Sequence, residues 1–299
     1  MSSRFEKLVS GLKANPSDTL IRGIRFLFGL AGSIFANLLY FFFRIQTYIV
    51  PTQTLAKLKQ ALNPTVRLDY SRHPIFLHAD SELSLSRAHA CQKEPETVAW
   101  IEELIKPGEV FYDVGANVGA YSLVASKYLH GDVIVHAFEP SFSTYYELCK
   151  NIVLNEYGQS IFPHMIGLSS ASGSMVFNYH SLEIGDSLHI LGEDLTVADA
   201  PLRPVFRQNI MAFTVDDLIL RFNYPVPNHI KLDVDGTELE ILMGAERTLR
   251  DPAVRSLLVE VHLLNGQADK VKTFLSKLGF EHVSETARGG PYWNYIFSR

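Results

Sequence analysis

Glycine and acidic residues cluster at the points where two short apolar runs of this sequence end. The first cluster belongs to the run at residues 110–114 and comprises Asp113, Gly115, Ala116, Asn117 and Gly119. Glycine permits a tight turn and lets a ligand approach the backbone closely. Glu139 ends the second run, and an acidic side chain there can accept both hydrogen bonds of a ribose diol. All six residues are therefore candidates for binding a nucleoside-containing cofactor.

The glycine pattern separates two kinds of cofactor. A dinucleotide site requires Gly-x-Gly-x-x-Gly, so that pyrophosphate can reach the N-terminus of a helix. Asn117 stands where the second glycine would be, and Ala120 where the third would be. Asp113 is also unfavourable beside a phosphate, whereas S-adenosylmethionine carries an ammonium and a sulfonium but no phosphate. We therefore expect S-adenosylmethionine; the alternative is a ligand-free turn with a capping Asp and a surface Glu.

A third cluster contains the catalytic candidates. Its members lie at the ends of two later apolar runs and are Lys231, Asp233, Asp235, Glu238, Glu260 and His262. Asp233 is the first choice, because it can orient an acceptor, bind an ammonium group or hold a metal. His262 is the candidate general base, since histidine side chains titrate near neutral pH. Lys231 shares a strand face with Asp233. In the alternative interpretations Lys231 only pairs with Asp233, and His262 is a core histidine.

A metal site is not predicted. Asp233 with Glu260 or His262 could bind Mg²⁺ or Mn²⁺, so a divalent metal stays open as an alternative. However, no spacing in the sequence is diagnostic of a metal, as a CxxC pair or HExxH would be. Neither a nucleophile elbow nor a P-loop occurs in the sequence.

The elements that must position these residues follow from hydrophobic periodicity and turn residues. Helices are predicted at 94–105, 120–129, 144–154, 239–249 and 268–277. Strands are predicted at 110–114, 133–138, 161–167, 230–234 and 256–262. Strands that alternate with helices indicate a parallel sheet with helices on both faces. Nucleotide-type ligands bind beyond the carboxyl ends of such strands, where all the candidate residues lie.

Two hairpins are also predicted. The first pairs residues 175–179 with 187–191 around Gly185-Asp186, and the second pairs 280–284 with 293–297 around Gly289-Gly290. The C-terminal hairpin places one antiparallel strand in the otherwise parallel sheet.

Four stretches of the sequence resemble the FkbM-type methyltransferase family. They are FYDVGANVGAYSL (111–123), HAFEP (136–140), HIKLDVDGTELEIL (229–242) and LLVEVH (257–262). The resemblance covers about residues 94–265. The family typically has Glu at the position of Asp235 and Ala at that of Thr237. The resemblance implies a class I methyltransferase fold, which is a Rossmann-like, doubly wound sheet. It also implies O-methylation, often of sugars or natural-product hydroxyls, so the expected partner is a small-molecule or glycan acceptor.

Composition sets broad limits on the function. The 299 residues are 47% hydrophobic and 20% charged, with a net charge of −5, which is ordinary for a globular protein. No Lys/Arg cluster stands out, so a nucleic-acid partner is not expected. Two other functions stay open, a nicotinamide-dependent oxidoreductase and a membrane-tethered binding module without turnover.

The predicted organisation has three parts: an N-terminal tail with a hydrophobic helix (1–50), a lead-in region (51–90) and a methyltransferase domain (91–299). Residues 26–43 are uncharged and lie between Arg25 and Arg44, at the lower limit of the roughly 17–25 residues that span a bilayer. They predict either a membrane-associated helix or a helix buried in the protein. Because S-adenosylmethionine is cytosolic, we expect the catalytic domain to face the cytoplasm.

Overall fold

The computed structural model describes residues 51–192, 196–197, 200–201, 203–263 and 266–299, together with Ile34 and Leu38. The chain divides into two compact units, Met1–Leu62 and Asn63–Arg299. Within the first unit, α3 spans Thr52–Ala61. The predicted hydrophobic segment at 26–43 lies outside the described residues, apart from Ile34 and Leu38. No helix within the described part of the chain is long and apolar enough to cross a membrane.

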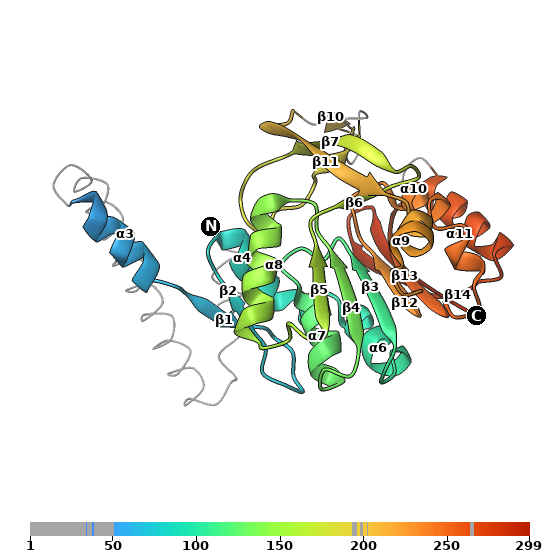
Figure 1. The fold of residues 1–299 in the computed structure, drawn as a ribbon, viewed down its shortest axis with the longest axis horizontal. Helices are drawn as coiled ribbons and strands as arrows, with labels where there is room; N and C mark the ends of the chain where they lie inside the picture. The colour runs from blue at the N-terminus through green and yellow to red at the C-terminus, as the bar shows by residue number, and fades with distance from the viewer. Residues whose placement is uncertain are drawn as a thin grey trace, which may run out of the picture. The chain divides into compact units, whose positions relative to one another are not determined.

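A seven-stranded sheet forms the centre of the second unit (Figure 1). Its strands, in spatial order, are β14 (Glu281–Gly289), β15 (Tyr292–Ser298), β13 (Ser256–His262), β12 (His229–Leu232), β3 (Val110–Val114), β4 (Ile134–Phe138) and β5 (Ile161–His164). The five strands from β13 to β5 pair in parallel, whereas β15 is antiparallel to both of its neighbours. The predicted doubly wound sheet with one antiparallel strand from a C-terminal hairpin is therefore confirmed.

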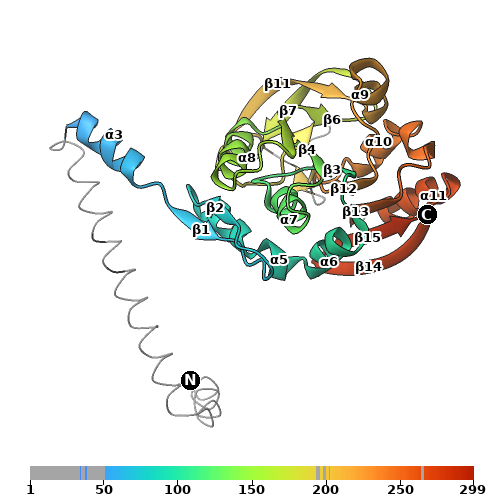
Figure 2. The same ribbon diagram turned by 60° about the horizontal axis from the view of Figure 1, so that its bottom comes forward.

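Helices cover both faces of this sheet (Figure 2). One face carries α6 (Pro95–Leu104), α7 (Ala120–Tyr128) and α8 (Phe142–Leu154), and the other carries α9 (Val215–Phe222), α10 (Glu238–Met243) and α11 (Gln267–Lys277). Side-chain alternation along β3 supplies both cores. Phe111 packs with the first helical layer, whereas Tyr112 and Val114 pack with the second. Burial of these apolar side chains from both directions stabilises the strand that carries the glycine turn.

The segment before α6 belongs to the same unit and packs against α8. It contains β1 (Thr65–Arg67), β2 (Phe76–His78), α4 (Glu82–Ser86), η1 (Arg87–His89) and α5 (Ala90–Lys93). Asn151 and Asn155 on α8 accept hydrogen bonds from the main-chain N–H groups of His78 and Phe76, at 2.7 and 2.9 Å. Leu77, between those two residues, is fully buried. The β1–β2 hairpin is therefore fixed to α8, and it brings η1 and α5 toward the carboxyl end of the main sheet.

A second, four-stranded sheet lies across that carboxyl end (Figure 1). In spatial order its strands are β6 (Gly167–Leu168), β11 (Phe206–Phe213), β7 (Gly173–Tyr179) and β8 (Ile190–Leu191). Two further strands of two residues each follow β8 in the chain and pair with each other, β9 (Thr196–Val197) and β10 (Ala200–Pro201). The predicted hairpin of 175–179 with 187–191 is confirmed in part, because the β7–β8 ladder pairs only Phe177 and Asn178 with Leu191 and Ile190.

Three parts of the secondary-structure prediction are wrong. The strand predicted at 161–167 ends at His164, and Gly167 belongs to the second sheet. The helix predicted at 239–249 ends at Met243, and a separate 3₁₀ turn, η2, follows at Thr248–Arg250. Gly244 ends α10 where a Cβ atom would lie 2.1 Å from the carbonyl oxygen of Ser169. β11 and α9 were not predicted. In β11, Arg, Gln and Asn interrupt the apolar pattern that would indicate a strand.

Substitution of Gly115 tests how tightly the turn after β3 is constrained. Its φ is +76°, and a Cβ atom would lie 1.8 Å from the carbonyl oxygen of Asp233. We expect Gly115→Ala to lower the free energy of unfolding by at least about 2 kcal/mol, because the backbone must move and a left-handed φ is strained with a side chain. Chemical denaturation measures this change. Gly158→Ala, where a Cβ meets nothing within 4 Å, should change stability by less than about 0.5 kcal/mol; equal effects at both sites would contradict the close approach.

Candidate active site

The turn after β3 is bound to the end of β4. The N–H groups of Gly115 and Ala116 both donate to the carbonyl oxygen of Phe138, each at 3.0 Å. The next N–H, that of Asn117, donates to Glu139 Oε2 at 3.0 Å, and Asn117 itself has a φ of +49°. The two halves of the predicted cofactor motif are therefore in direct contact.

Glu139 is buried, and its carboxyl group has a second fixed contact. Its Oε1 accepts a hydrogen bond from the N–H of Ser141 at 2.9 Å. Burial raises the pKa of Glu139 to about 7, although the two main-chain N–H groups oppose that rise. Each carboxyl oxygen keeps a free lone pair for a ligand hydroxyl. The geometry therefore leaves Glu139 able to accept hydrogen bonds from a diol.

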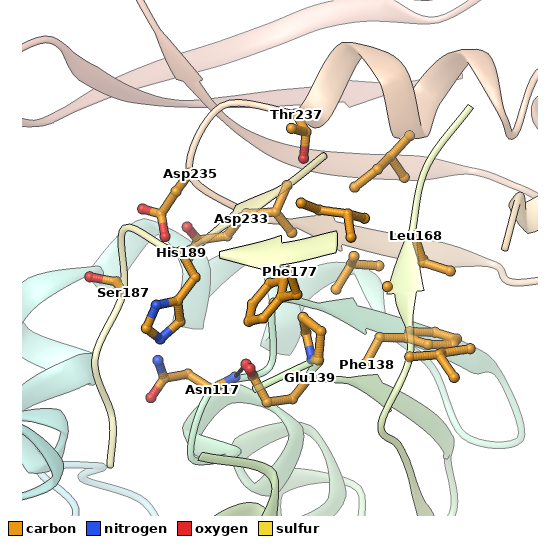
Figure 3. A pocket seen from close by; sticks show the side chains of 18 of the residues that line it. Asn117, Phe138, Glu139, Leu168, Phe177, Ser187, His189, Asp233, Asp235 and Thr237 are labelled. Atoms are coloured by element: carbon orange, nitrogen blue, oxygen red, sulfur yellow. Dashed lines mark hydrogen bonds between the residues drawn. The ribbon is translucent and has the colours of Figure 1, made fainter. Parts of the chain in front are cut away.

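A cavity opens beyond the carboxyl ends of β3, β4 and β12; we call it the strand-end cavity (Figure 3). Its free space, including the open mouth, is about 780 Å³. Its apolar walls are formed by Val114, Phe138, Ile166, Leu168, Phe177, Leu191 and Ile241. Its polar groups come from Arg87, Asn117, Glu139, Asp186, Ser187, His189, Asp233, Asp235 and Thr237. Apolar walls beside the buried Glu139 carboxyl group suit a nucleoside.

Two further cavities adjoin it. The turn cavity lies over the glycine turn and is lined by Ser86, Arg87, Ala90, Lys93, Glu94, Gly115, Ala116, Asn117, Val118, Ala120, Tyr121, Lys231 and Asp233. The charged cavity is lined by Arg87, Lys93, Glu94, Ser187, Leu188, Asp233, Asp235, Glu260, Arg288, Gly289 and Tyr292. Arg87 and Asp233 line all three cavities. A bound molecule can therefore extend from the strand-end cavity through the turn cavity, with its middle beside Asp233.

Lys231 holds Asp233 in place. Its amine donates to Asp233 Oδ2 at 2.9 Å, lies 3.9 Å from Asp113 Oδ1, and stands 5.2 Å from the ring centre of Tyr121. Burial alone would lower the pKa of the Lys231 amine, but the two carboxylates raise it above its ordinary value. Burial alone would raise the pKa of Asp233, but Lys231 lowers it to about 2. Asp233 is therefore an anion at the junction of the cavities.

Asp113 lies beneath the site, contrary to the prediction that it meets a cationic ligand directly. It is fully buried, and it is absent from the linings of the three cavities. Its Oδ2 accepts a hydrogen bond from the hydroxyl of Ser122 at 2.6 Å, and burial raises its pKa. Asp113 influences the cavities through Lys231. A strand-end position in the sequence cannot distinguish a buried carboxylate from one that faces a ligand.

Gly119 also lies outside the three cavity linings. Its φ is +86°, and a Cβ atom would lie 2.5 Å from Leu148 Cδ1. Gly119 therefore allows α7 to begin close against α8, whereas Gly115 is the glycine that borders the cavities.

Glu260 forms a pair with Asp233 that the sequence analysis considered only as part of a metal site. The two carboxyl groups hydrogen-bond to each other. Burial and the charge of Asp233 raise the pKa of Glu260 to about 9. Arg288 Nε lies 3.4 Å from Glu260 Oε1, and Arg288 also pairs with Glu94. The carboxyl pair thus shares one proton and lies between the cations of Lys231 and Arg288.

Arg288 was missed by the sequence analysis. It comes from β14, which reaches the site only because β15 pairs beside β13 in the main sheet. The C-terminal hairpin was predicted, but Arg288 lies at a bulge of the β14–β15 ladder, between Ala287 and Gly289, which the sequence does not predict.

His262, the predicted general base, is not brought to the cavities. Its ring packs against Tyr292 at 4.9 Å, and it is absent from all three linings. Its Nε2 is buried without a hydrogen-bond partner among the described residues. His262 is the last residue of β13 and lies two residues beyond Glu260. Glu260, and not the histidine, therefore lines the charged cavity.

Residues 180–189 form a strap over the strand-end cavity. Asn117 Nδ2 donates to the carbonyl of Asp186 at 3.1 Å, and Arg87 Nη2 donates to that of Gly185 at 2.7 Å. On the other side, the N–H of Leu188 donates to Asp235 Oδ2 at 2.7 Å. Burial and the charge of Asp233 raise the pKa of Asp235 to about 6. The strap therefore covers the cavity through contacts with three separate elements.

The structure gives no separate support for a metal. The described residues include no group of three or more His, Cys, Asp or Glu arranged to hold a metal ion.

The pH dependence of the free energy of unfolding tests whether Glu260 is protonated in the folded protein. Its pKa rises on folding from about 4.5 to about 9, so the folded protein binds the extra proton between these values and loses stability as pH rises through that window. Glu260→Gln mimics the protonated acid and removes this loss. We expect the variant to gain at least about 1 kcal/mol over the wild type between pH 5 and 9, measured by urea denaturation. The exposed Glu281→Gln is the control, and a pH-independent difference for Glu260→Gln would show that the carboxyl is ionised in the folded state.

Comparison with known proteins agrees with this geometry. The family described as "Methyltransferase FkbM domain" matches residues 113–282, more than half of the chain. The chain is 27% identical over 169 residues to hexuronic acid methyltransferase AglP of Haloferax volcanii, a match that covers 56% of this chain and 62% of the relative. It is 28% identical over 200 residues to 31-O-demethyl-FK506 methyltransferase FkbM of Streptomyces tacrolimicus, covering 60% of this chain and 76% of the relative.

Among solved structures, TYW2 of P. horikoshii in complex with MeSAdo is 14% identical with a TM-score of 0.42, covering 79% of this chain and 70% of that one. The family match includes β4, β12, β13 and the last two residues of β3, the strands whose ends form the cavities. The chain belongs to the FkbM methyltransferase family.

Proposed function

We propose that this protein transfers a methyl group from S-adenosylmethionine to a hydroxyl of a polyhydroxylated small molecule, such as a sugar. The observation that carries the proposal is the meeting of three cavities at the Asp233 carboxylate. One cavity suits a nucleoside, one suits an amino-acid group, and one is lined mainly by charged and polar side chains. Membership in the FkbM family supports the same cofactor.

The residues present fit this cofactor, which supplies an electrophilic methyl group on a sulfonium. In the strand-end cavity, Phe138 and Leu168 offer apolar walls for an adenine ring, and Glu139 accepts from the ribose hydroxyls. In the turn cavity, the Gly115–Ala116 backbone leaves room because Gly115 has no side chain. The carboxylate of Glu94 suits the ammonium, and Arg87 or Lys93 suits the carboxylate of the methionine part.

The charged cavity is the proposed acceptor site. Glu94, Asp233, Asp235 and Glu260 offer oxygen acceptors or donors, and Arg288 offers guanidinium donors. Tyr292 adds an aromatic side chain to this lining. Alternating donors and acceptors beside an aromatic ring suit a sugar better than a flat apolar acceptor. The hexuronic acid named for the archaeal relative is of this chemical class.

Asp233 is the proposed catalytic residue. A carboxylate lone pair that neither Lys231 nor Glu260 uses can accept a hydrogen bond from the acceptor hydroxyl, and so aim a lone pair of the hydroxyl oxygen along the line of displacement. With a pKa of about 2, Asp233 is a weak base toward a free hydroxyl. The oxygen becomes strongly acidic as its bond to carbon forms, so the O–H bond breaks late and the proton passes to the Asp233–Glu260 pair. Lys231 keeps Asp233 ionised and oriented until Asp233 takes up that proton.

Cofactor binding is tested with S-adenosylhomocysteine and NAD in parallel calorimetric titrations of the full chain. We expect S-adenosylhomocysteine to bind, and a hundredfold excess over its dissociation constant to stabilise the protein by about 2.7 kcal/mol. NAD should give neither heat nor a thermal shift, because Asn117 and Ala120 replace the glycines that a pyrophosphate needs. Binding of NAD without S-adenosylhomocysteine would reverse the assignment.

Asp233→Asn tests the catalytic proposal. The variant keeps the size of the side chain but removes its charge, so methyl transfer should fall at least about a hundredfold. Affinity for S-adenosylhomocysteine should change by less than about tenfold. Transfer from radiolabelled S-adenosylmethionine to a panel of uronic acids and neutral sugars measures the first quantity. The exposed Asp269→Asn on α11 is the control.

Three results would change this account. Normal turnover of Asp233→Asn would remove Asp233 from the mechanism, and a collapse of cofactor affinity would assign it to ammonium binding. Loss of wild-type activity in EDTA, with recovery in Mg²⁺, would assign it to a metal.

A further inference from the structure

We propose that His189 is a cofactor-recognition residue that donates a hydrogen bond from Nε2 to a ribose hydroxyl beside Glu139. The inference rests on the proposed function, because it assumes that the strand-end cavity holds the adenosine part of S-adenosylmethionine. His189 was not among the candidates from the sequence, and it lies on the strap just before β8.

The hydrogen bonds of the ring identify the nitrogen that carries the proton. Nδ1 of His189 accepts from the main-chain N–H of His180 at 3.1 Å. Burial lowers the pKa of His189 to about 4, so the ring is neutral at physiological pH and its single proton lies on Nε2. The outer nitrogen is thus a donor before any ligand arrives.

That donor is unsatisfied. The side chain is among the buried polar residues, at 9% exposure, and Nε2 has no hydrogen-bond partner among the described residues. Buried polar groups in folded proteins nearly always have partners, and an exception needs an explanation. His189 lines the strand-end cavity, so a ligand in that cavity is the partner that the geometry offers.

The ring is held rigidly in this orientation. It packs against Phe177 and Tyr179, with ring centres 5.5 and 5.2 Å away. Tyr179 is itself fixed, because its hydroxyl donates to Gln208 at 2.8 Å and accepts from the N–H of Phe142 at 3.3 Å. Ordering of a side chain before binding reduces the entropy that the ligand must otherwise overcome.

His189 complements Glu139. Figure 3 shows the imidazole beside Asn117, whose main-chain N–H binds Glu139. Glu139 accepts the O–H hydrogens of a diol, which leaves the lone pairs of the hydroxyl oxygens without a donor. The N–H of His189 supplies that donor from the same cavity. A ribose hydroxyl between the two residues therefore has both of its hydrogen-bonding roles satisfied.

Two substitutions distinguish the roles of the two ring nitrogens of His189. His189→Asn keeps an acceptor near the Nδ1 position for the N–H of His180, but it lacks a donor at the Nε2 position. His189→Gln carries its amide near Nε2 and keeps that donor. We expect the dissociation constant of S-adenosylhomocysteine, measured by calorimetry, to rise at least about tenfold in His189→Asn and less than about threefold in His189→Gln. Thermal unfolding of the ligand-free variants shows whether each is folded.

Ligands that lack one hydroxyl test the contact without reliance on either variant. The 2′-deoxy and 3′-deoxy analogues of S-adenosylhomocysteine are titrated into the wild type and His189→Asn. One analogue should bind the wild type at least about tenfold more weakly than the parent, while His189→Asn should discriminate against it much less. Equal discrimination by both proteins, or wild-type affinity in a folded His189→Asn, would overturn the role of His189 and leave the proposed function intact. Failure of the wild type to bind S-adenosylhomocysteine would instead overturn the proposed function.

Discussion

The buried ion pair between Lys231 and Asp233 is the interaction on which the site depends. Lys231 is 1% exposed, and an amine removed from water this completely is stable only beside compensating negative charge. Asp233 provides that charge directly, and Asp113 provides it from the neighbouring strand. The end of β12 also requires glycine at position 115, because the carbonyl oxygen of Asp233 occupies the space where a side chain of residue 115 would be. Charge pairing and close backbone contact thus fix β12, β3 and the turn in one arrangement.

Two neighbouring carboxyl groups are held in opposite protonation states around this pair. Lys231 keeps Asp233 ionised, while burial and the proximity of that anion keep Glu260 protonated. Arg288 limits the cost of placing both acids together, and its contact with Glu94 connects the C-terminal hairpin to the start of α6. Separation of acid and base roles between adjacent carboxyls is a common way to run proton transfer at neutral pH. The charged cavity is therefore lined by one ionised and one protonated member of this pair.

The sequence predicts the main sheet well, because β3, β4, β12 and β13 are apolar runs that end in turn signals, and their spacing implies parallel pairing. The contact between Asn117 and Glu139 follows from that topology. The direction in which side chains point at the strand ends does not follow from the topology. This is why the sequence did not show that Asp113 lies beneath the site and that His262 lies beside it. Arg288 and His189 were missed although the hairpins that carry them are predicted, because the pairings that fix these hairpins at the site, β15 with β13 and β7 with β11, join segments far apart in the sequence. The polar pattern of β11, the central strand of that sheet, hides it from a periodicity argument.

The most direct test of the account is a crystal structure of the protein with S-adenosylhomocysteine. We expect the ribose to lie between Glu139 and His189, the adenine to lie between the apolar walls that include Phe138 and Leu168, and the sulfur to face the junction at Asp233. A ligand bound elsewhere, or bound in these cavities with its sulfur directed away from Asp233, would contradict the assignment of the three cavities and the catalytic role drawn from it.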